Sequence, residues 1–237
     1  MAELLSTKYR PIVNAATLLG QSKTAHQAEI AAAAAPTDFY RFNAHYMREI
    51  YSGQPVSSPG MWNYVEYRAL EGFVLAITPF NFTAIGGNLS TSPALMGNTV
   101  LWKPASTAVL SSYYLMELFK EAGLPDGVIN FIPGSGGKVG GPAMAMPTLA
   151  GIHFTGSTEV FQMMWSTVGE NIKNYKAIRG SSARPAARTS SSRIRRPMST
   201  HSWRIPSGVL SNIKDRNARR RRAPISRRAF GTRSKSA

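Results

Sequence analysis

Apolar and polar residues follow two periods along this chain, and the pattern changes from helical to strand-like near residue 72. Phe73–Ile77 and Thr99–Trp102 are short apolar runs, typical of strands buried on both faces. Between them lies a small-residue segment with helical character from about Phe82 to Met96, which Pro93 is expected to break or restart. Strand, helix and strand in this order predict a βαβ unit. In such sheets ligands bind beyond the carboxyl ends of the strands.

The same alternation continues toward residue 172. We expect an amphipathic helix over Thr107–Ala122, with Leu110, Tyr114, Leu118 and Phe119 inward, capped by Ser106 or Thr107 and ended by Gly123. Further expected elements are a strand over Val128–Ile132, a glycine-rich loop over Pro133–Pro142, a strand over Gly151–Phe154 and a helix to about Ile172. Strands and helices that alternate at this spacing predict an α/β fold with a doubly wound parallel sheet.

The first 60 residues predict helices. Ala2–Leu19 has helical spacing with Gly20 as its stop, and Ser22 is expected to cap a longer helix to about Ile50, kinked at Pro36. An aromatic and aliphatic stripe on this longer helix should face a core: Phe39, Tyr40, Phe42, Tyr46, Met47 and Ile50. After a Pro/Gly/Ser loop, Trp62–Leu70 alternates as an exposed strand does.

The excess positive charge of the chain is confined to its last quarter. The net charge is +16 from 28 Lys/Arg and 12 Asp/Glu, yet residues 1–176 hold 11 of each, so the excess lies in 177–237. We expect this basic tail to be disordered, because it contains little to bury. It could bind nucleic acid without sequence preference through its arginines.

Several chemistries are excluded by the residues themselves. The absence of cysteine excludes disulfides and a thiol nucleophile, and the four histidines form no cluster with metal-ligand spacing. No apolar run is long enough for a membrane span. Gly134–Val139 fails the dinucleotide fingerprint, because Val139 stands where its third glycine belongs.

Three groups of polar residues fall at expected strand ends. Thr155–Thr158 places glycine and hydroxyls at a strand-to-helix junction, which suits a phosphate group but equally suits an ordinary N-cap. Lys103 could bind ribose hydroxyls or phosphate, or be a solvated lysine. Asn81 could direct its amide at a developing oxyanion, or only hold a turn.

Taken in order, these motifs resemble the cofactor-binding half of the NAD(P)-dependent aldehyde dehydrogenases. The resemblance rests on Ile77–Phe82 (ITPFNF), Leu101–Pro104 (LWKP) and Phe154–Ser157 (FTGS), and it covers residues 3 to about 176. The string FNFTAIGGNLSTSPALMGNTVLWKP is similar to the branch that oxidises L-glutamate gamma-semialdehyde with NAD in proline breakdown, in the mitochondrial matrix. The chain is therefore identified as a member of this family and as an internal fragment with an incomplete Rossmann-like domain.

The resemblance implies roles for named residues. Asn81 would stabilise the oxyanion of the thiohemiacetal, and Thr78 and Phe80 would line the nicotinamide side of the NAD site. Lys103 would hold the adenosine ribose. The pyrophosphate would lie at the start of a helix, on Gly156, Ser157, Thr158, Glu159 and Val160.

The resemblance also implies a domain plan and an assembly. Residues 1–60 would form a helical segment, 61–71 a strand of the family's oligomerisation arm, 72–176 a partial NAD-binding domain and 177–237 the basic tail. The family is homo-oligomeric and acts on a small-molecule substrate, here glutamate semialdehyde; no membrane partner is implied. From its first residues, which lack an Arg/Ser-rich segment, we expect no mitochondrial targeting segment in this chain.

The chain departs from the family at the two residues that carry the chemistry. The family uses a glutamate in a Glu-x-Gly-Gly motif and a cysteine in a Gly-Gln-x-Cys motif, and neither motif is present. With one choice among the synonymous codons, and read one base earlier, Ala183–Ser190 gives Glu-Thr-Gly-Gly-Lys-Asp-Phe and Ile213–Arg219 gives Gln-Gly-Gln-Lys-Cys-Ser. We therefore interpret residues 178–237 as frameshifted and expect the chain to be catalytically inactive. The alternatives are a non-catalytic regulatory fragment, or a basic nucleic-acid-binding protein acting through 177–237.

Overall fold

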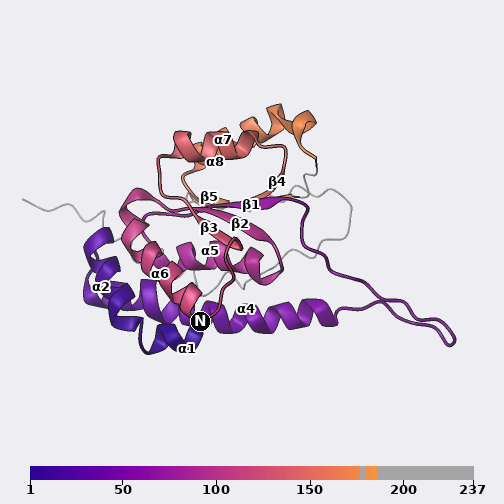
Figure 1. The fold of residues 1–237 in the computed structure, drawn as a ribbon, viewed down its shortest axis with the longest axis horizontal. Helices are drawn as coiled ribbons and strands as arrows, with labels where there is room; N and C mark the ends of the chain where they lie inside the picture. The colour runs from indigo at the N-terminus through magenta and orange to yellow at the C-terminus, as the bar shows by residue number, and fades with distance from the viewer. Residues whose placement is uncertain (177–179, 186–237) are drawn as a thin grey trace, which may run out of the picture. The chain divides into compact units, whose positions relative to one another are not determined.

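A five-stranded parallel sheet forms the centre of the fold (Figure 1). The computed structural model describes residues 1–176 and, as backbone only, 180–185. The strands are β1 (Phe73–Ile77), β2 (Thr99–Lys103), β3 (Ile129–Phe131), β4 (Leu149–Gly156) and β5 (Gly180–Pro185), in the order β3-β2-β1-β4-β5. Every neighbouring pair is parallel. The predicted α/β fold with a doubly wound parallel sheet is confirmed.

Helices precede the sheet and connect its strands. Before β1 they are α1 (Ala2–Ser6), α2 (Arg10–Gln21), α3 (Ala25–Ala28), the π-helical η1 (Glu29–Ala34) and α4 (Ala35–Ser52). From β1 onward they are α5 (Thr83–Leu95), the short η2 (Ser106–Ala108), α6 (Val109–Glu121), the π-helical η3 (Gly136–Gly140), α7 (Gly141–Ala145), α8 (Thr158–Glu170) and the short η4 (Ile172–Asn174).

Two hydrophobic clusters cover the two faces of the sheet. Helices α5 and α6 lie on one face with the N-terminal helices beyond them, and α7 and α8 lie on the other (Figure 1). The first cluster is built around Trp102 and Phe119, both fully buried. The second joins Leu75 and Phe154 of the sheet to Met164 of α8. Apolar strands therefore form because both of their faces are buried.

The strand order changes direction at β1, which lies between β2 and β4. From β1 the chain proceeds outward to β2 and β3 on one side, then returns to place β4 on the other. Ile77, the last residue of β1, is in register with Lys103 of β2 and Phe154 of β4. The carboxyl ends of these three strands therefore meet at one edge, at the position where open α/β sheets bind ligands.

The helix boundaries near the N-terminus differ from the prediction. Helix α2 runs through Gly20 and ends at Ser22, which adopts φ 51°. A Cβ on Gly20 would lie 2.6 Å from the Thr107 carbonyl oxygen, so this glycine permits close packing and does not stop the helix. Thr24, not Ser22, caps the next helix, in a capping box with Gln27.

The aromatic stripe on α4 faces a core only in part. Tyr40 packs on the first cluster, but Phe42 is 56% exposed and the buried residues of α4 are Pro36 and Thr37. The second half of α4 extends away from the sheet (Figure 1). The predicted burial of the whole stripe is therefore wrong, because the helix continues past the elements it packs on.

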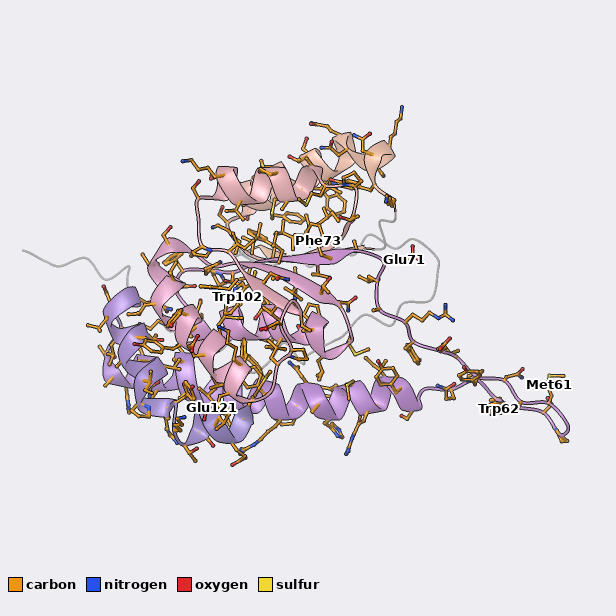
Figure 2. The ribbon with its side chains drawn as sticks, in the orientation of Figure 1. Met61, Trp62, Glu71, Phe73, Trp102 and Glu121 are labelled. Atoms are coloured by element: carbon orange, nitrogen blue, oxygen red, sulfur yellow. The ribbon has the colours of Figure 1, made fainter. Side chains whose placement is uncertain are left out.

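The segment that follows α4 folds back on itself as an arm, which we define as residues 53–71. Met61 and Trp62 lie at its tip, far from Trp102 in the sheet (Figure 2). The predicted strand over Trp62–Leu70 is not formed. The two limbs are joined largely through side chains: the Gln54 amide accepts from the Val65 N–H at 2.8 Å, and Asn63 N–H donates to Ser57 Oγ at 3.0 Å.

Other differences concern helix ends and turns. Pro93 lies inside α5 without breaking it, and Leu110 is 41% exposed on α6. No side chain caps η2 or α6, so the expected Ser106 or Thr107 cap is wrong, whereas Gly123 ends α6 at φ +88° as predicted. The expected loop over Pro133–Pro142 contains η3 and the start of α7.

Residues expected to begin a tail without structure form a strand instead. Gly180–Pro185 pairs with Gly151–Gly156 of β4 as β5. A parallel ladder joins backbone groups, so its formation does not depend on an apolar sequence. The rest of the basic tail lies outside the described residues. Within the part that is described, no helix is long and apolar enough to cross a membrane.

Candidate functional site

Thr78 is fixed at the carboxyl end of β1 by two contacts with β2. Its Oγ1 accepts a 3.1 Å hydrogen bond from Trp102 Nε1, and its N–H donates to the Lys103 carbonyl oxygen at 3.2 Å. The side chains of Thr78 and Trp102 are both buried. The structure therefore brings Thr78 and Lys103 together and holds the start of the loop that leads to Asn81.

Within the loop from Thr78 to Phe82, two side chains are presented at the surface. Phe80 is 60% exposed and Asn81 is also exposed. Phe82 occupies the N-cap position of α5 in an extended conformation, without a side-chain cap. The Asn81 amide is thus positioned near a helix N-terminus, where the helix dipole favours negative charge.

Lys103 ends β2 as a half-buried cation. Burial lowers the pKa of its ammonium group, because the charged form loses hydration. Among the described residues no carboxylate is paired with it. A ligand with hydroxyl or phosphate oxygens would restore the hydrogen bonds that burial removes.

The strand-to-helix junction after β4 has the local geometry of an anion site. Ser157 is the N-cap of α8, and its Oγ accepts from the Val160 N–H at 3.3 Å. Thr158 Oγ1 is buried and has no hydrogen-bond partner within the described part of the chain. Glu159 and Val160 are exposed on the first turn. An orphaned hydroxyl beside free helix N–H groups fits a bound phosphate.

Gly156 matters because of its neighbour in the same strand. A Cβ at this position would lie 2.5 Å from the Phe154 ring. The glycine therefore lets the backbone pass close to that ring and enter α8. The sequence analysis expected a glycine at this strand-to-helix junction, and the close approach of the Phe154 ring explains why a larger residue would not fit.

Lys23 was missed by the sequence analysis. It follows α2, and its Nζ lies 4.8 Å from the centroid of the Phe82 ring. Burial lowers its pKa from an ordinary 10.5 to about 8, although an aromatic face attracts a cation. The signal was available only in three dimensions, because 58 intervening residues separate it from Phe82.

The described residues form no candidate metal site. Among residues 1–176, no group of three or more His, Asp or Glu side chains could hold an ion. His153 is half-buried beside α5, where its Nδ1 lies 3.1 Å from the Leu89 carbonyl oxygen. Burial lowers its pKa, and it makes no approach to other ligating side chains that would form such a group.

Comparison with known proteins identifies the family of the chain. The profile of the Aldehyde dehydrogenase family matches residues 1–184, more than three quarters of the chain. The chain belongs to the aldehyde dehydrogenase family. The match ends within Gly180–Pro185, so the resemblance extends somewhat further than the roughly 176 residues expected from the motifs.

Individual relatives refine the branch of the aldehyde dehydrogenase family. The chain is 56% identical over 176 residues to the probable delta-1-pyrroline-5-carboxylate dehydrogenase of Schizosaccharomyces pombe, covering 74% of this chain and 32% of that protein. It is 50% identical over 174 residues to the human mitochondrial delta-1-pyrroline-5-carboxylate dehydrogenase, covering 73% and 31%. The chain spans about a third of the length of the curated relatives it matches.

A solved structure shows the same fold. The delta-pyrroline-5-carboxylate dehydrogenase of Mycobacterium tuberculosis, bound with NAD, superposes with a TM-score of 0.76 at 52% identity, covering 78% of this chain and 34% of that one. The chain is thus similar to the delta-1-pyrroline-5-carboxylate dehydrogenases in both sequence and fold. Several of these relatives are named as mitochondrial.

Proposed function

We propose that this chain is the NAD-binding part of an enzyme that oxidises L-glutamate gamma-semialdehyde to L-glutamate in proline breakdown. The observation that carries the proposal is the shared edge of β1, β2 and β4, where Thr78, Lys103 and the start of α8 lie at the strand ends. The similarity to an NAD-bound dehydrogenase of the same branch supports NAD as the ligand of this edge.

The residues present fit this cofactor. The orphaned Thr158 hydroxyl, the first N–H groups of α8 and the close-packed Gly156 would hold the pyrophosphate, with Ser157, Glu159 and Val160 on the same turn. Lys103 would bind the adenosine ribose through its half-buried ammonium group. Thr78 and Phe80 would line the nicotinamide side. Bound NAD supplies the hydride acceptor.

Asn81 would contribute to the chemistry on the aldehyde side. Its exposed amide, at the N-terminal end of α5, would donate a hydrogen bond to the oxygen of the aldehyde as negative charge develops there. The family's reaction also needs a thiol nucleophile, and these 237 residues contain no cysteine. On their own they would bind NAD without turnover.

We further propose that residues 178–237 are encoded in a shifted frame, which would explain the loss of both catalytic motifs. The support is the pair of family motifs that reappear one base earlier in the basic tail. Sequencing the coding DNA across the Ala177 codon tests this: one missing base is expected, and an intact frame with unrelated codons would refute it.

Assembly and location follow from the same similarity. The arm carries exposed Trp62 and Tyr64, stacked at 5.1 Å, which would bury against a second subunit in a homo-oligomer. The whole enzyme would act on its small-molecule substrate in the mitochondrial matrix, since relatives in this branch are named as mitochondrial.

The experiment that tests the proposal is a turnover assay paired with a binding assay. We expect the purified chain to bind NAD and to form no NADH with the semialdehyde above the enzyme-free rate. Co-expression with an intact subunit tests whether the arm assembles. NADH formation by the chain alone would show that a nucleophile other than a thiol is sufficient, and would overturn the proposed inactivity.

A further inference from the structure

Lys23 lies next to Phe82 on the aldehyde side of the proposed site, and within the described residues no acidic side chain is paired with it. It lies in the connection between α2 and α3, and its Nζ is 4.8 Å from the centroid of the Phe82 ring. Phe82 follows Asn81 directly and is the N-cap of α5. The amine is therefore close to the start of the helix beside which the aldehyde oxygen is expected to bind.

Buried hydrogen bonds hold this connection in place. Gln21 Nε2 donates to Thr83 Oγ1 at 2.7 Å and to Ser111 Oγ at 3.3 Å. The hydroxyls of Thr17 and Thr83 are 2.8 Å apart. They attach the end of α2 to the first turn of α5, and Ser22 at φ 51° then turns the chain toward Phe82. The backbone immediately before Lys23 is therefore attached to α5 by hydrogen bonds, and the Lys23 ammonium group contacts the Phe82 ring.

In the part of the chain that the structure describes, no acidic side chain is paired with Lys23. The loop before α5 and α5 itself carry no charged residue at all. On the N-terminal side, Glu29 already binds Arg10 and accepts from Asn14 at 2.6 Å, and His26 is exposed on α3. Among the described residues, Lys23 makes no hydrogen bond or ion pair.

This environment favours the neutral amine. Burial without a counter-charge lowers the pKa of Lys23 to about 8. A desolvated lysine is an activated nucleophile toward carbonyl groups. At pH 7.5 its neutral fraction is about two hundred times that of a lysine with an ordinary pKa near 10.5.

We propose that Lys23 is a covalent binding site for aldehydes, forming a reversible imine with an aldehyde that enters beside Asn81. The inference rests on the proposed function only in taking an aldehyde as the ligand class. The neutral amine attacks the carbonyl carbon, a C–N bond forms, and a proton moves from nitrogen to oxygen. Loss of water from this carbinolamine gives the imine, and addition of water reverses it. No oxidant or reductant is consumed.

Reductive trapping tests the proposal on the intact chain. The protein is incubated at pH 7.5 with 4-oxobutanoate, an aldehyde that carries a carboxylate and cannot cyclise, and with cyanoborohydride, which reduces the imine to a stable secondary amine. Peptide mass spectrometry then gives a labelling rate for each lysine. We expect Lys23 to be labelled at least about tenfold faster than Lys120, an exposed lysine on α6.

Two controls separate this result from general lysine reactivity and from cofactor binding. In denaturing urea, Lys23 and Lys120 should be labelled at equal rates, because the rate difference depends on the fold. Lys23→Arg keeps the positive charge and should lose the label while binding NAD as the unmodified chain does. Equal rates for Lys23 and Lys120 in the folded chain would overturn the proposal, even if NAD binds. Loss of NAD binding with rapid Lys23 labelling would overturn only the proposed function.

Discussion

Trp102 Nε1 donates a 3.1 Å hydrogen bond to Thr78 Oγ1, and this bond links the middle of the hydrophobic core to the first residue of the candidate site. Trp102 is fully buried and packs its ring 5.3 Å from that of Phe131. Thr78 is the residue at which β1 becomes the loop to Asn81. The packing of Trp102 against Phe131 of β3 therefore helps to determine the position of the loop.

Replacing Thr78 tests this link. Thr78→Val has nearly the same shape but leaves the buried indole N–H without an acceptor, so we expect a loss of about 1–3 kcal/mol in the free energy of unfolding. Thr78→Ser keeps the acceptor and should lose clearly less. Urea unfolding followed by tryptophan fluorescence measures both. Equal losses for the two variants would show that the hydrogen bond does not contribute.

The sequence predicted the sheet because buried strands carry a simple signal. Phe73–Ile77 was predicted with its observed bounds. A short apolar run between Gly72 and Thr78-Pro79 is typical of a buried strand, and the proline ends it. Gly72 itself adopts φ +119°, and a Cβ there would lie 2.0 Å from the Thr148 carbonyl oxygen. The ends of the strands could therefore be predicted from the sequence, and so could the positions of Lys103 at the end of β2 and Gly156 at the end of β4.

Features that depend on distant contacts were not predictable in this way. The apolar stripe with Phe42 has helical periodicity whether or not another element covers it. In the arm, Trp62–Leu70 alternates as a strand does, but the limbs are joined largely by side chains such as Gln54. Lys23 has no sequence signal because its environment is created by Phe82.

Tyr40 and Gly87 form a close contact whose cost can be measured. The Tyr40 hydroxyl is buried without a hydrogen-bond partner among the described residues, and a Cβ on Gly87 would lie 2.5 Å from it. Tyr40→Phe removes an unsatisfied group, so we expect a gain of about 1 kcal/mol in unfolding free energy. Gly87→Ala should be destabilising, and less so when combined with Tyr40→Phe.

A double-mutant cycle of these two substitutions gives the coupling directly. We expect a coupling of about 1 kcal/mol or more, because the hydroxyl is the nearest atom to the new methyl group. Purely additive effects would mean that the surrounding helices move apart, and the steric explanation for Gly87 would then fail.

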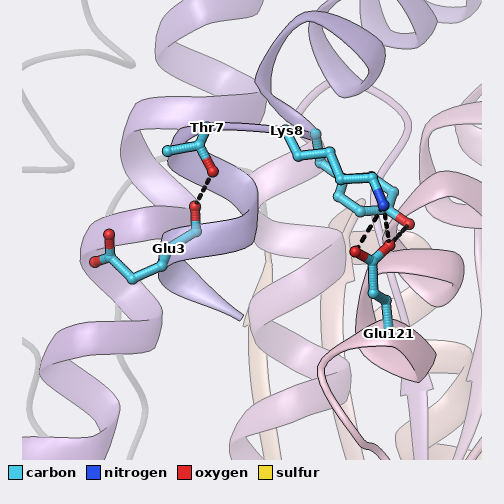
Figure 3. Close-up of polar contacts among 5 residues, drawn as sticks. Glu3, Thr7, Lys8 and Glu121 are labelled. Carbon is cyan, nitrogen blue, oxygen red and sulfur yellow. Dashed lines mark hydrogen bonds and ion pairs between the residues drawn. The ribbon is translucent and has the colours of Figure 1, made fainter.

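Tyr9 and Lys8 meet at the carboxylate of Glu121 (Figure 3). Lys8 Nζ lies 2.6 Å from Glu121 Oε1, and the Tyr9 hydroxyl donates to Oε2 at 2.7 Å. The hydrogen bond and the negative charge raise the pKa of Tyr9 to about 12. Because the folded pKa lies above the ordinary 10, the stability from this bond is complete below pH 10 and is lost as pH rises toward 12.

The pH dependence of unfolding checks this assignment. The unfolding free energy of the unmodified chain should exceed that of Tyr9→Phe by about 1 kcal/mol near neutral pH, and the difference should shrink between pH 10 and 12. Combining both chains with Glu121→Gln should abolish that pH dependence. A difference that stays constant through this range would contradict the proposed bond.

His153 gives the opposite dependence at lower pH. Burial beside α5 lowers its pKa below the ordinary 6.5, so the unfolded state takes up a proton more readily than the folded one. Its contribution is complete above pH 6.5 and declines as pH falls below it. We expect His153→Gln to flatten the fall in unfolding free energy on acidification, whereas the exposed His26→Gln should leave it unchanged. If the unfolding free energy falls equally steeply with acidification in both variants, His153 is not the cause of the fall.

The most direct test of the central claim, that the edge shared by β1, β2 and β4 holds NAD, is calorimetric titration of the purified chain with NAD. The account predicts saturable binding that Lys103→Met weakens by about tenfold and Lys120→Met does not change. A folded chain that shows no saturable binding, or that binds equally well in both variants, would contradict it.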